Sequence, residues 1–128
     1  MTHTTIVLLP TYNERENVGL IVSEIFARYP DLRVVVIDDS SPDGTGAVVQ
    51  EMMARFPGLS LLSRPKKEGL GIAYKHGIRH VLSMGGVERI IMMDADGSHD
   101  VAYIGPLLAA SDTHDLVIGS RYVQGGGI

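Results

Sequence analysis

The sequence lacks cysteine, which excludes disulfide bonds and thiolate chemistry and suits a reducing compartment. It has no apolar run close to the roughly 20 residues that a helix needs to cross a bilayer. No signal peptide is expected, because residues 1–5 carry no basic segment and Pro10 ends the first apolar stretch. Basic residues are the minority, 11 Lys and Arg against 15 Asp and Glu, so no general nucleic-acid-binding surface is expected. These absences predict a cytoplasmic chain.

What the sequence does contain is enough for one folded domain with a hydrophobic core. The chain has 128 residues, 45% of them hydrophobic, and it shows no internal repeat and no low-complexity linker. Continuous apolar runs predict buried strands at residues 6–9, 34–37, 59–62, a run that ends at Asp94, and 116–118. Amphipathic helices are predicted between the first four. This alternation is typical of an α/β fold with helices on both faces of a mostly parallel sheet.

The predicted helices are marked by apolar residues three or four positions apart. Such residues recur over 18–26, 48–56 and 70–82. The three helices are expected to stop near Pro30, Pro57 and Gly85. Asn13 and Glu16 have the spacing of a capping pair, so they are expected to cap the start of the first helix.

Two carboxylates one residue apart, Asp94 and Asp96, end the fourth apolar run. In an extended chain, residues i and i+2 point to the same side. Carboxylates that close repel each other, and a site that holds both in ionised form usually also holds a cation. Oxygen ligands suit Mg²⁺ or Mn²⁺, and Mg²⁺ often shares them with substrate phosphates. The pattern favours a divalent-metal site, and the alternative is a pair of solvated aspartates in a loop.

Polar residues also follow the first and second predicted strands. The three strand-end segments are residues 10–14, 38–41 and 94–96. In open α/β sheets, ligands bind beyond the carboxyl ends of the strands, where the strand order switches. We therefore predict a site formed by the ends of the first, second and fourth strands. Asp43 can be explained as a helix cap.

These features belong to five blocks that occur in a fixed order. The blocks are Pro10-Thr11-Tyr12-Asn13-Glu14, Ile37-Asp38-Asp39-Ser40-Ser41-Pro42-Asp43-Gly44-Thr45, Gly69-Leu70-Gly71-Ile72-Ala73, Asp94-Ala95-Asp96-Gly97-Ser98-His99 and Gly119-Ser120-Arg121-Tyr122. From about residue 5 to the last residue, the chain resembles family 2 glycosyltransferases of the Rossmann-like GT-A fold, and most of all polyprenol-phosphate (dolichol-phosphate) mannosyltransferases. The resemblance implies an inverting enzyme that moves mannose from GDP-mannose to a polyprenyl phosphate with Mg²⁺ or Mn²⁺.

The resemblance also implies a nucleotide-sugar site. The implied binding residues are Pro10, Tyr12, Glu14, Ile37, Asp39, Asp94, Ala95, Asp96 and Arg121. Tyr12 would pack beside the base, with Pro10 and Glu14 completing that wall. Asp39 would accept hydrogen bonds from the base or the ribose, whereas Asp38 would be a buried structural partner.

The same resemblance assigns the metal to Asp96, with Asp94 beside it. Related enzymes often have Gln where this chain has Ser98, and the shorter hydroxyl makes direct metal contact by Ser98 doubtful. The metal would stabilise charge on the leaving nucleoside diphosphate. Arg121 would bind phosphate oxygens, or alternatively pair with a carboxylate. His99 is expected on the acceptor side or behind the metal ligands, because no second His stands at metal spacing.

The five blocks contain no residues that the resemblance assigns to binding the acceptor. No general base is found, which agrees with a phosphate acceptor, because a phosphate monoester is already ionised near neutral pH. Lys66 and Lys67 could approach phosphate. Since similar enzymes are longer, residues 1–128 are predicted to be the nucleotide-sugar-binding, N-terminal part of a GT-A domain, apparently truncated at its C-terminus. A lipid acceptor would require peripheral membrane association or a membrane partner subunit.

Several alternatives remain open. The donor could be UDP-glucose or another nucleotide sugar, and the chain could bind its donor without turnover. Asp94-Ala95-Asp96-Gly97-Ser98 also fits haloacid dehalogenase phosphatases, but that motif normally opens its domain. Gly69-Leu70-Gly71 suggests a dinucleotide-binding module, but Tyr74 stands where the third glycine belongs.

Overall fold

The computed structural model describes residues 4–95 and 101–111. The elements, in chain order, are β1 (Thr5–Thr11), α1 (Arg15–Arg28), β2 (Arg33–Asp38), α2 (Thr45–Met53), β3 (Leu59–Ser63), α3 (Leu70–Met84), β4 (Arg89–Met92), the 3-10 helix η1 (Val101–Tyr103) and α4 (Ile104–Ser111). The predicted α/β class is confirmed, as is the alternation of the first four strands with three helices. The predicted strand at residues 116–118 lies outside the described residues.

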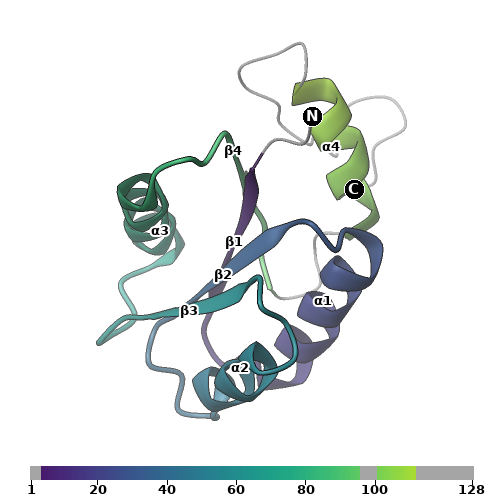
Figure 1. Ribbon diagram of the computed structural model, residues 1–128. Helices are drawn as coiled ribbons and strands as arrows, with labels where there is room; N and C mark the ends of the chain where they lie inside the picture. The colour runs from purple at the N-terminus through teal and green to yellow at the C-terminus, as the bar shows by residue number, and fades with distance from the viewer. Residues whose placement is uncertain (1–3, 96–100, 112–128) are drawn as a thin grey trace, which may run out of the picture.

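The described strands form one parallel sheet in the order β3-β2-β1-β4 (Figure 1). The chain builds outward from β1 through β2 to β3, and then returns to the other side of β1 to form β4. The strand order therefore reverses between β1 and β4. At their carboxyl ends this reversal creates the crevice in which open α/β sheets bind ligands.

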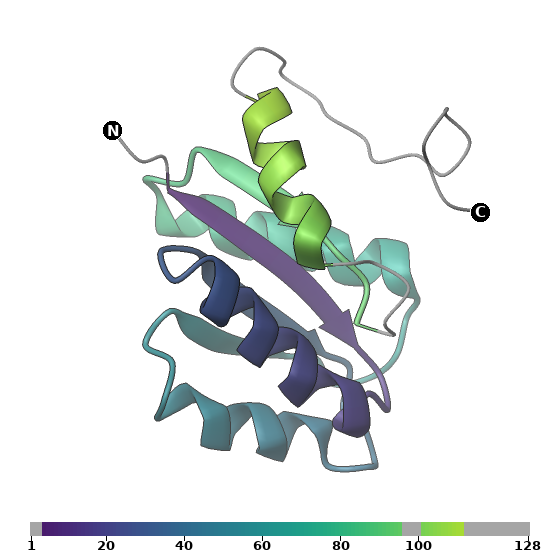
Figure 2. The same cartoon turned by 90° about the vertical axis from the view of Figure 1, so that its right-hand side faces the viewer.

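Helices cover both faces of this sheet, with α1, α2 and α4 on one face and α3 on the other (Figures 1 and 2). Successive strand residues point to opposite faces, so each central strand contributes to two cores. The core under α1, α2 and α4 takes Val7, Leu9, Val34 and Val36 from the two central strands. The core under α3 takes Ile6, Leu8, Val35 and Ile37. This double burial explains why the strands are continuously apolar.

Helix α3 lies close against the sheet at Gly77. A Cβ atom at this position would lie 2.5 Å from Cδ1 of Ile37 and 3.2 Å from Cδ1 of Leu8. Glycine therefore lets the helix lie against β1 and β2, although it is a poor helix former. The first turn of α3 lies at the carboxyl edge of the sheet, because the helix follows β3 in the chain.

The start of α1 and the end of β4 differ from the predictions. The predicted capping pair of Asn13 and Glu16 is wrong, because the N-cap residue is Glu14 and it makes no side-chain capping bond. Asn13 adopts a left-handed backbone conformation with φ of 55°, which asparagine tolerates better than most residues. Strand β4 ends at Met92 rather than Asp94, after a last backbone bond from the Met93 amide to the Leu8 carbonyl (3.1 Å).

Helix α4 was not predicted from the sequence. It is short and contains Gly105 and Pro106, so it carries no extended helical pattern. Tertiary contacts hold it in place. Ile104 is buried in the core under α1, α2 and α4, and the amide of Gly105 donates to the Tyr29 hydroxyl (3.0 Å).

Candidate functional site

The loop after β1 is fixed by the loop after β2. The backbone amide of Glu14 donates to Oγ1 of Thr45 (3.1 Å), and that of Arg15 donates to Oδ2 of Asp43 (3.1 Å). The amide and the hydroxyl of Thr45 donate to Oδ1 of Asp43. Asp43 is therefore not the N-cap residue of α2, which is Gly44, but its carboxylate accepts from the first amide of α1 and from the first amide of α2. The hydrogen bond from the Thr45 hydroxyl lowers the pKa of Asp43 below its ordinary value.

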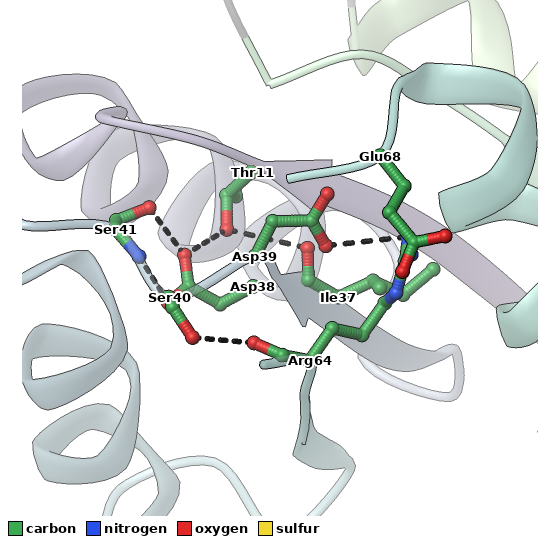
Figure 3. Close-up of polar contacts among 8 residues, drawn as sticks. All are labelled: Thr11, Ile37, Asp38, Asp39, Ser40, Ser41, Arg64 and Glu68. Carbon is green, nitrogen blue, oxygen red and sulfur yellow. Dashed lines mark hydrogen bonds and ion pairs between the residues drawn. The ribbon is translucent and has the colours of Figure 1, made fainter. Parts of the chain in front are cut away.

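Asp38 is a buried structural residue at the end of β2 (Figure 3). Its Oδ1 accepts hydrogen bonds from the hydroxyls of Thr11 (2.8 Å) and Ser41 (2.6 Å), and its Oδ2 accepts one from the Ser41 amide (3.2 Å). The carboxylate thus ties the end of β1 to the loop after β2. This geometry agrees with the structural role expected for Asp38.

Asp39 is also buried, but its surroundings are different. Its amide donates to the Thr11 carbonyl (3.2 Å), and its Oδ1 lies 3.4 Å from Nη1 of Arg64 (Figure 3). Burial raises the pKa of the Asp39 carboxyl above its ordinary value, Arg64 opposes this effect, and the charge of Asp38 adds to it. Asp39 is therefore a carboxylate whose ionisation depends on its neighbours.

Asp94 follows β4 on the other side of the strand-order switch. Its Oδ1 accepts a hydrogen bond from the Tyr74 hydroxyl (2.8 Å), so α3 orients a residue at the end of β4. The side chain is only partly buried. Among the described residues, no three His, Asp or Glu side chains gather as a metal site, and Asp94 is the one predicted metal ligand within them. A half-buried, oriented carboxylate at this edge fits one ligand of a hard cation.

A pocket of about 250 Å³ opens at this edge, between the ends of β1, β2 and β4 and the start of α3. Its lining residues are Pro10, Thr11, Tyr12, Glu14, Asp39, Lys67, Gly69, Leu70, Ala73, Asp94 and Ala95. The structure therefore brings together Pro10, Tyr12, Glu14, Asp39, Asp94 and Ala95, as the strand-end argument expected. Polar side chains from the three strand ends therefore line one pocket, as predicted.

Other predicted residues are not part of this pocket in the described structure. Ile37 is fully buried in the core under α3 and does not line the pocket. Asp96, Ser98, His99 and Arg121 lie outside the described residues. Their roles stay predictions from the sequence.

The structure adds residues that the sequence analysis did not select. Tyr74 was considered only as part of the apolar stripe over residues 70–82 and as a departure from the dinucleotide motif, yet its hydroxyl reaches Asp94. Arg64 was not considered, although it directly follows β3 and so stands at the same sheet edge. Lys67, which was expected only near phosphate, places its Nζ 4.5 Å from the centre of the Tyr12 ring. Position after a strand was the signal that would have found Arg64.

Residues 6–128 match the family model of glycosyl transferase family 2. The chain belongs to glycosyl transferase family 2. Its sequence is similar to the polyprenol monophosphomannose synthase of Mycolicibacterium smegmatis, at 45% identity over 127 residues that cover 98% of this chain and 48% of that protein. It is also similar to the undecaprenyl-phosphate mannosyltransferase of Micrococcus luteus, at 44% identity over 119 residues, or 93% of this chain and 49% of the relative.

A solved structure supports the fold of this family 2 chain. A mannosyltransferase from Pyrobaculum calidifontis, in complex with GDP-Man and Mn²⁺, is similar with a TM-score of 0.66 and 28% identity, over 75% of this chain and 28% of that chain. The predicted family and the GT-A fold are confirmed. The chain spans about half the length of the two curated relatives.

The family assignment also decides against two alternatives. Asp94 follows the fourth strand along the chain and does not open the domain, as a haloacid dehalogenase phosphatase would require. The segment Gly69-Leu70-Gly71 lies between β3 and α3, whereas the dinucleotide fingerprint occupies the first strand-to-helix turn.

Proposed function

We propose that this chain forms the donor-binding part of an inverting mannosyltransferase that transfers mannose from GDP-mannose to a polyprenyl phosphate. The observation that carries the proposal is the 44–45% identity, over nearly the whole chain, to a polyprenol monophosphomannose synthase and an undecaprenyl-phosphate mannosyltransferase. The pocket supports the proposal. The carboxylates of Asp39 and Asp94, the ammonium group of Lys67 and the ring of Tyr12 line it where the strand order switches.

In this proposal the pocket divides into a base side and a phosphate side. Tyr12 lies beside the base, and Asp39 accepts hydrogen bonds from base or ribose N–H and O–H groups. Lys67, held over the Tyr12 ring, contributes positive charge toward the diphosphate. Asp94, with Asp96, would hold Mg²⁺ or Mn²⁺ against the diphosphate. When bound, the cation supplies Lewis-acid stabilisation of the leaving nucleoside diphosphate.

The acceptor in this proposal needs no general base from the protein. The phosphate oxygen of a polyprenyl phosphate is already anionic near neutral pH, and it attacks the anomeric carbon directly. The C–O bond to the diphosphate breaks as the new C–O bond forms on the opposite side, which inverts the configuration. The protein's task is then to hold the donor and the acceptor in line.

Isothermal calorimetry with GDP-mannose and UDP-glucose, each with and without Mn²⁺, tests the donor. We expect Mn²⁺-dependent binding with preference for GDP-mannose, and its loss in Asp94→Asn, which keeps the acceptor for Tyr74 but removes the charge. Asp31→Asn is the matched control, since Asp31 is exposed and precedes β2 at the far end of the strands. Preference for UDP-glucose would favour the alternative donor, and binding of neither would contradict the proposal.

The second candidate function is donor binding without turnover. The observation that favours it is that this chain spans only about half the length of each curated relative. A transfer assay with labelled GDP-mannose and a short polyprenyl phosphate should compare this chain with a chain of the relatives' full length. We expect transfer by the longer chain and reduced transfer by these 128 residues, because acceptor positioning contributes several kcal/mol. Equal rates would contradict this expectation.

We further propose that the chain works at an anionic membrane surface. Five of the 11 basic residues but one of the 15 acidic residues lie within residues 64–84. Lys75 and Arg79 are exposed on α3, with exposed Ile72 and Leu82 at helical spacing beside them. Such a face suits an interfacial helix. Among the described residues, no helix has the length and apolar character of a membrane span.

A further inference from the structure

Arg64 is a buried cation directly behind the pocket. It follows β3, and its amide donates to the Asp38 carbonyl (2.8 Å) while its carbonyl accepts from the Ser40 hydroxyl (2.5 Å). Its side chain is only 3% exposed. Arginine is rarely buried unless it is paired, so this guanidinium needs carboxylate partners close by.

The guanidinium lies between two carboxylates (Figure 3). Its Nη1 is 3.4 Å from Oδ1 of Asp39, and its Nη2 is 3.5 Å from Oε1 of Glu68. Within the described residues, neither its three nitrogens nor Oδ1 of Asp39 has a hydrogen-bond partner, so the contacts are ion pairs. Asp39 lines the pocket, but Arg64 does not. Arg64 therefore reaches the pocket indirectly, through its ion pair with Asp39.

We propose that Arg64 is a positioning residue that keeps Asp39 ionised and holds Oδ1 away from the pocket, so that Oδ2 accepts hydrogen bonds from the donor. This inference rests on the proposed function for the identity of the donor. The charge on Asp39 is a property of the free protein and does not depend on that identity.

The balance of charge around Asp39 makes Arg64 necessary. Burial already raises the pKa of this carboxyl, and the charges of Asp38 and Glu68 add to that effect. Arg64 is the main opposing influence, and a hydrogen bond from the Glu68 backbone opposes it to a lesser extent. Removing Arg64 should therefore raise the pKa of the Asp39 carboxyl further. A protonated Asp39 loses its charge and turns one oxygen into a donor, which weakens acceptance from the base or ribose. The charged groups that face Asp39 are Asp38, Arg64 and Glu68, and across the pocket Glu14, Lys67 and Asp94.

The first test measures the titration of the Asp39 carboxyl by carbon-13 NMR in the free protein. Arg64→Gln should raise its midpoint by roughly one pH unit or more, and Arg64→Lys should restore much of the difference. Glu68→Gln is the matched second variant: it removes a negative neighbour from a partly exposed position and should lower the midpoint. A midpoint that rises in Arg64→Gln and falls in Glu68→Gln is expected only if the charges of these two side chains act on Asp39.

Either of two results would overturn the inference. One is a midpoint for Asp39 that Arg64→Gln leaves unchanged. The other is a change in the same direction for Arg64→Gln and Glu68→Gln, which would indicate a merely structural role. If Arg64→Gln fails to fold, Arg64→Lys and Glu68→Gln still decide, since Glu68→Gln must lower the midpoint.

The second test measures GDP-mannose affinity by calorimetry as a function of pH. Both phosphates of this ligand are esterified, so neither loses a proton near neutral pH. Affinity for Arg64→Gln should approach that of the parent at high pH and fall about tenfold per pH unit below the midpoint of Asp39. A loss that is equal at every pH would overturn the role in donor binding. Absence of binding by the parent would instead contradict the proposed function, while the NMR titration would still decide the role of Arg64.

Discussion

Asp38 and Asp39 are adjacent carboxylates with different surroundings at the end of β2. Asp38 receives hydrogen bonds on both oxygens from Thr11 and Ser41, whereas Asp39 has an ion pair on one side and the pocket on the other. Asp38 is the last residue of β2 and Asp39 is the first residue after it, so one position separates a structural residue from a pocket-lining residue. A substitution at Asp38 should therefore act on the fold, and one at Asp39 on the ligand.

At the residue scale, the carboxylate of Asp43 should stabilise the fold only while it is ionised. Hydrogen bonding from Thr45 lowers its pKa in the folded protein, so its contribution is present above the ordinary value of 3.8 and is lost as pH falls through the lower folded value. Asp43→Asn keeps the shape and removes the charge. Thermal melts should show a less stable variant at pH 6, with the difference closing below that ordinary value. A constant difference at every pH would contradict this prediction, and Asp31→Asn controls for charge removal elsewhere.

Tyr74 should set metal affinity through Asp94. Its hydroxyl orients the Asp94 carboxylate, and loss of such a supporting bond typically costs roughly 10–100-fold in metal affinity. Tyr74→Phe should raise by that factor the Mn²⁺ concentration that half-saturates GDP-mannose binding. Tyr29→Phe removes a hydroxyl that bonds Gly105, remote from the pocket, and should leave this concentration unchanged. An unchanged Mn²⁺ dependence in Tyr74→Phe would show that the bond is dispensable.

At the scale of single elements, α3 should depend on the absence of a side chain at Gly77. Alanine gains helix propensity at either glycine, but only at position 77 would its Cβ meet Ile37 and Leu8, since nothing lies within 4 Å of a Cβ at Gly71. Gly77→Ala should therefore be less stable than Gly71→Ala by about 1–3 kcal/mol in urea denaturation. Equal stabilities would mean that the core shifts to accept the extra methyl group.

The elements themselves were predictable because burial on both faces leaves a strong pattern. The strands at 5–11 and 33–38 each contain an uninterrupted apolar run, at 6–10 and 34–37. Proline or glycine follows each of the first three helices, so the order of the elements could be predicted. The cap of α1 could not be predicted, because Glu14 and Arg15 bond Thr45 and Asp43, which lie about thirty residues away. Helix α4 was missed because its position depends on tertiary contacts with Tyr29.

The candidate site was partly predictable for a related reason. Parallel strands bring their carboxyl ends to one edge, so the gathering of Tyr12, Asp39 and Asp94 was expected from strand order alone. The contacts of Arg64 and Tyr74 with these carboxylates depend on how β3 and α3 pack. Sequence spacing carries no direct signal of such packing.

At the scale of the whole molecule, the uneven charge should direct vesicle binding. Sedimentation with phosphatidylcholine vesicles should recover little protein, and inclusion of anionic phosphatidylglycerol should recover more. Lys75→Glu with Arg79→Glu should weaken binding at least about tenfold, since each basic residue near an anionic surface contributes about 1 kcal/mol. Arg33→Glu with Arg55→Glu makes the same change in net charge away from α3 and should have a smaller effect. Equal weakening by both pairs would contradict a surface centred on α3.

The bonds that fix the start of α1 also decide how a diphosphate can be held. Helix N-termini attract anions through free amides and the positive end of the helix dipole. Here a carboxylate already occupies that end: Asp43 accepts from the Arg15 amide, and Thr45 accepts from the Glu14 amide. Although Glu14 lines the pocket, α1 offers little attraction to phosphate. In the proposed function, compensation for the negative charge of the donor would therefore come from Lys67 and from a bound cation, so the site would need positive charge from outside the α1 backbone.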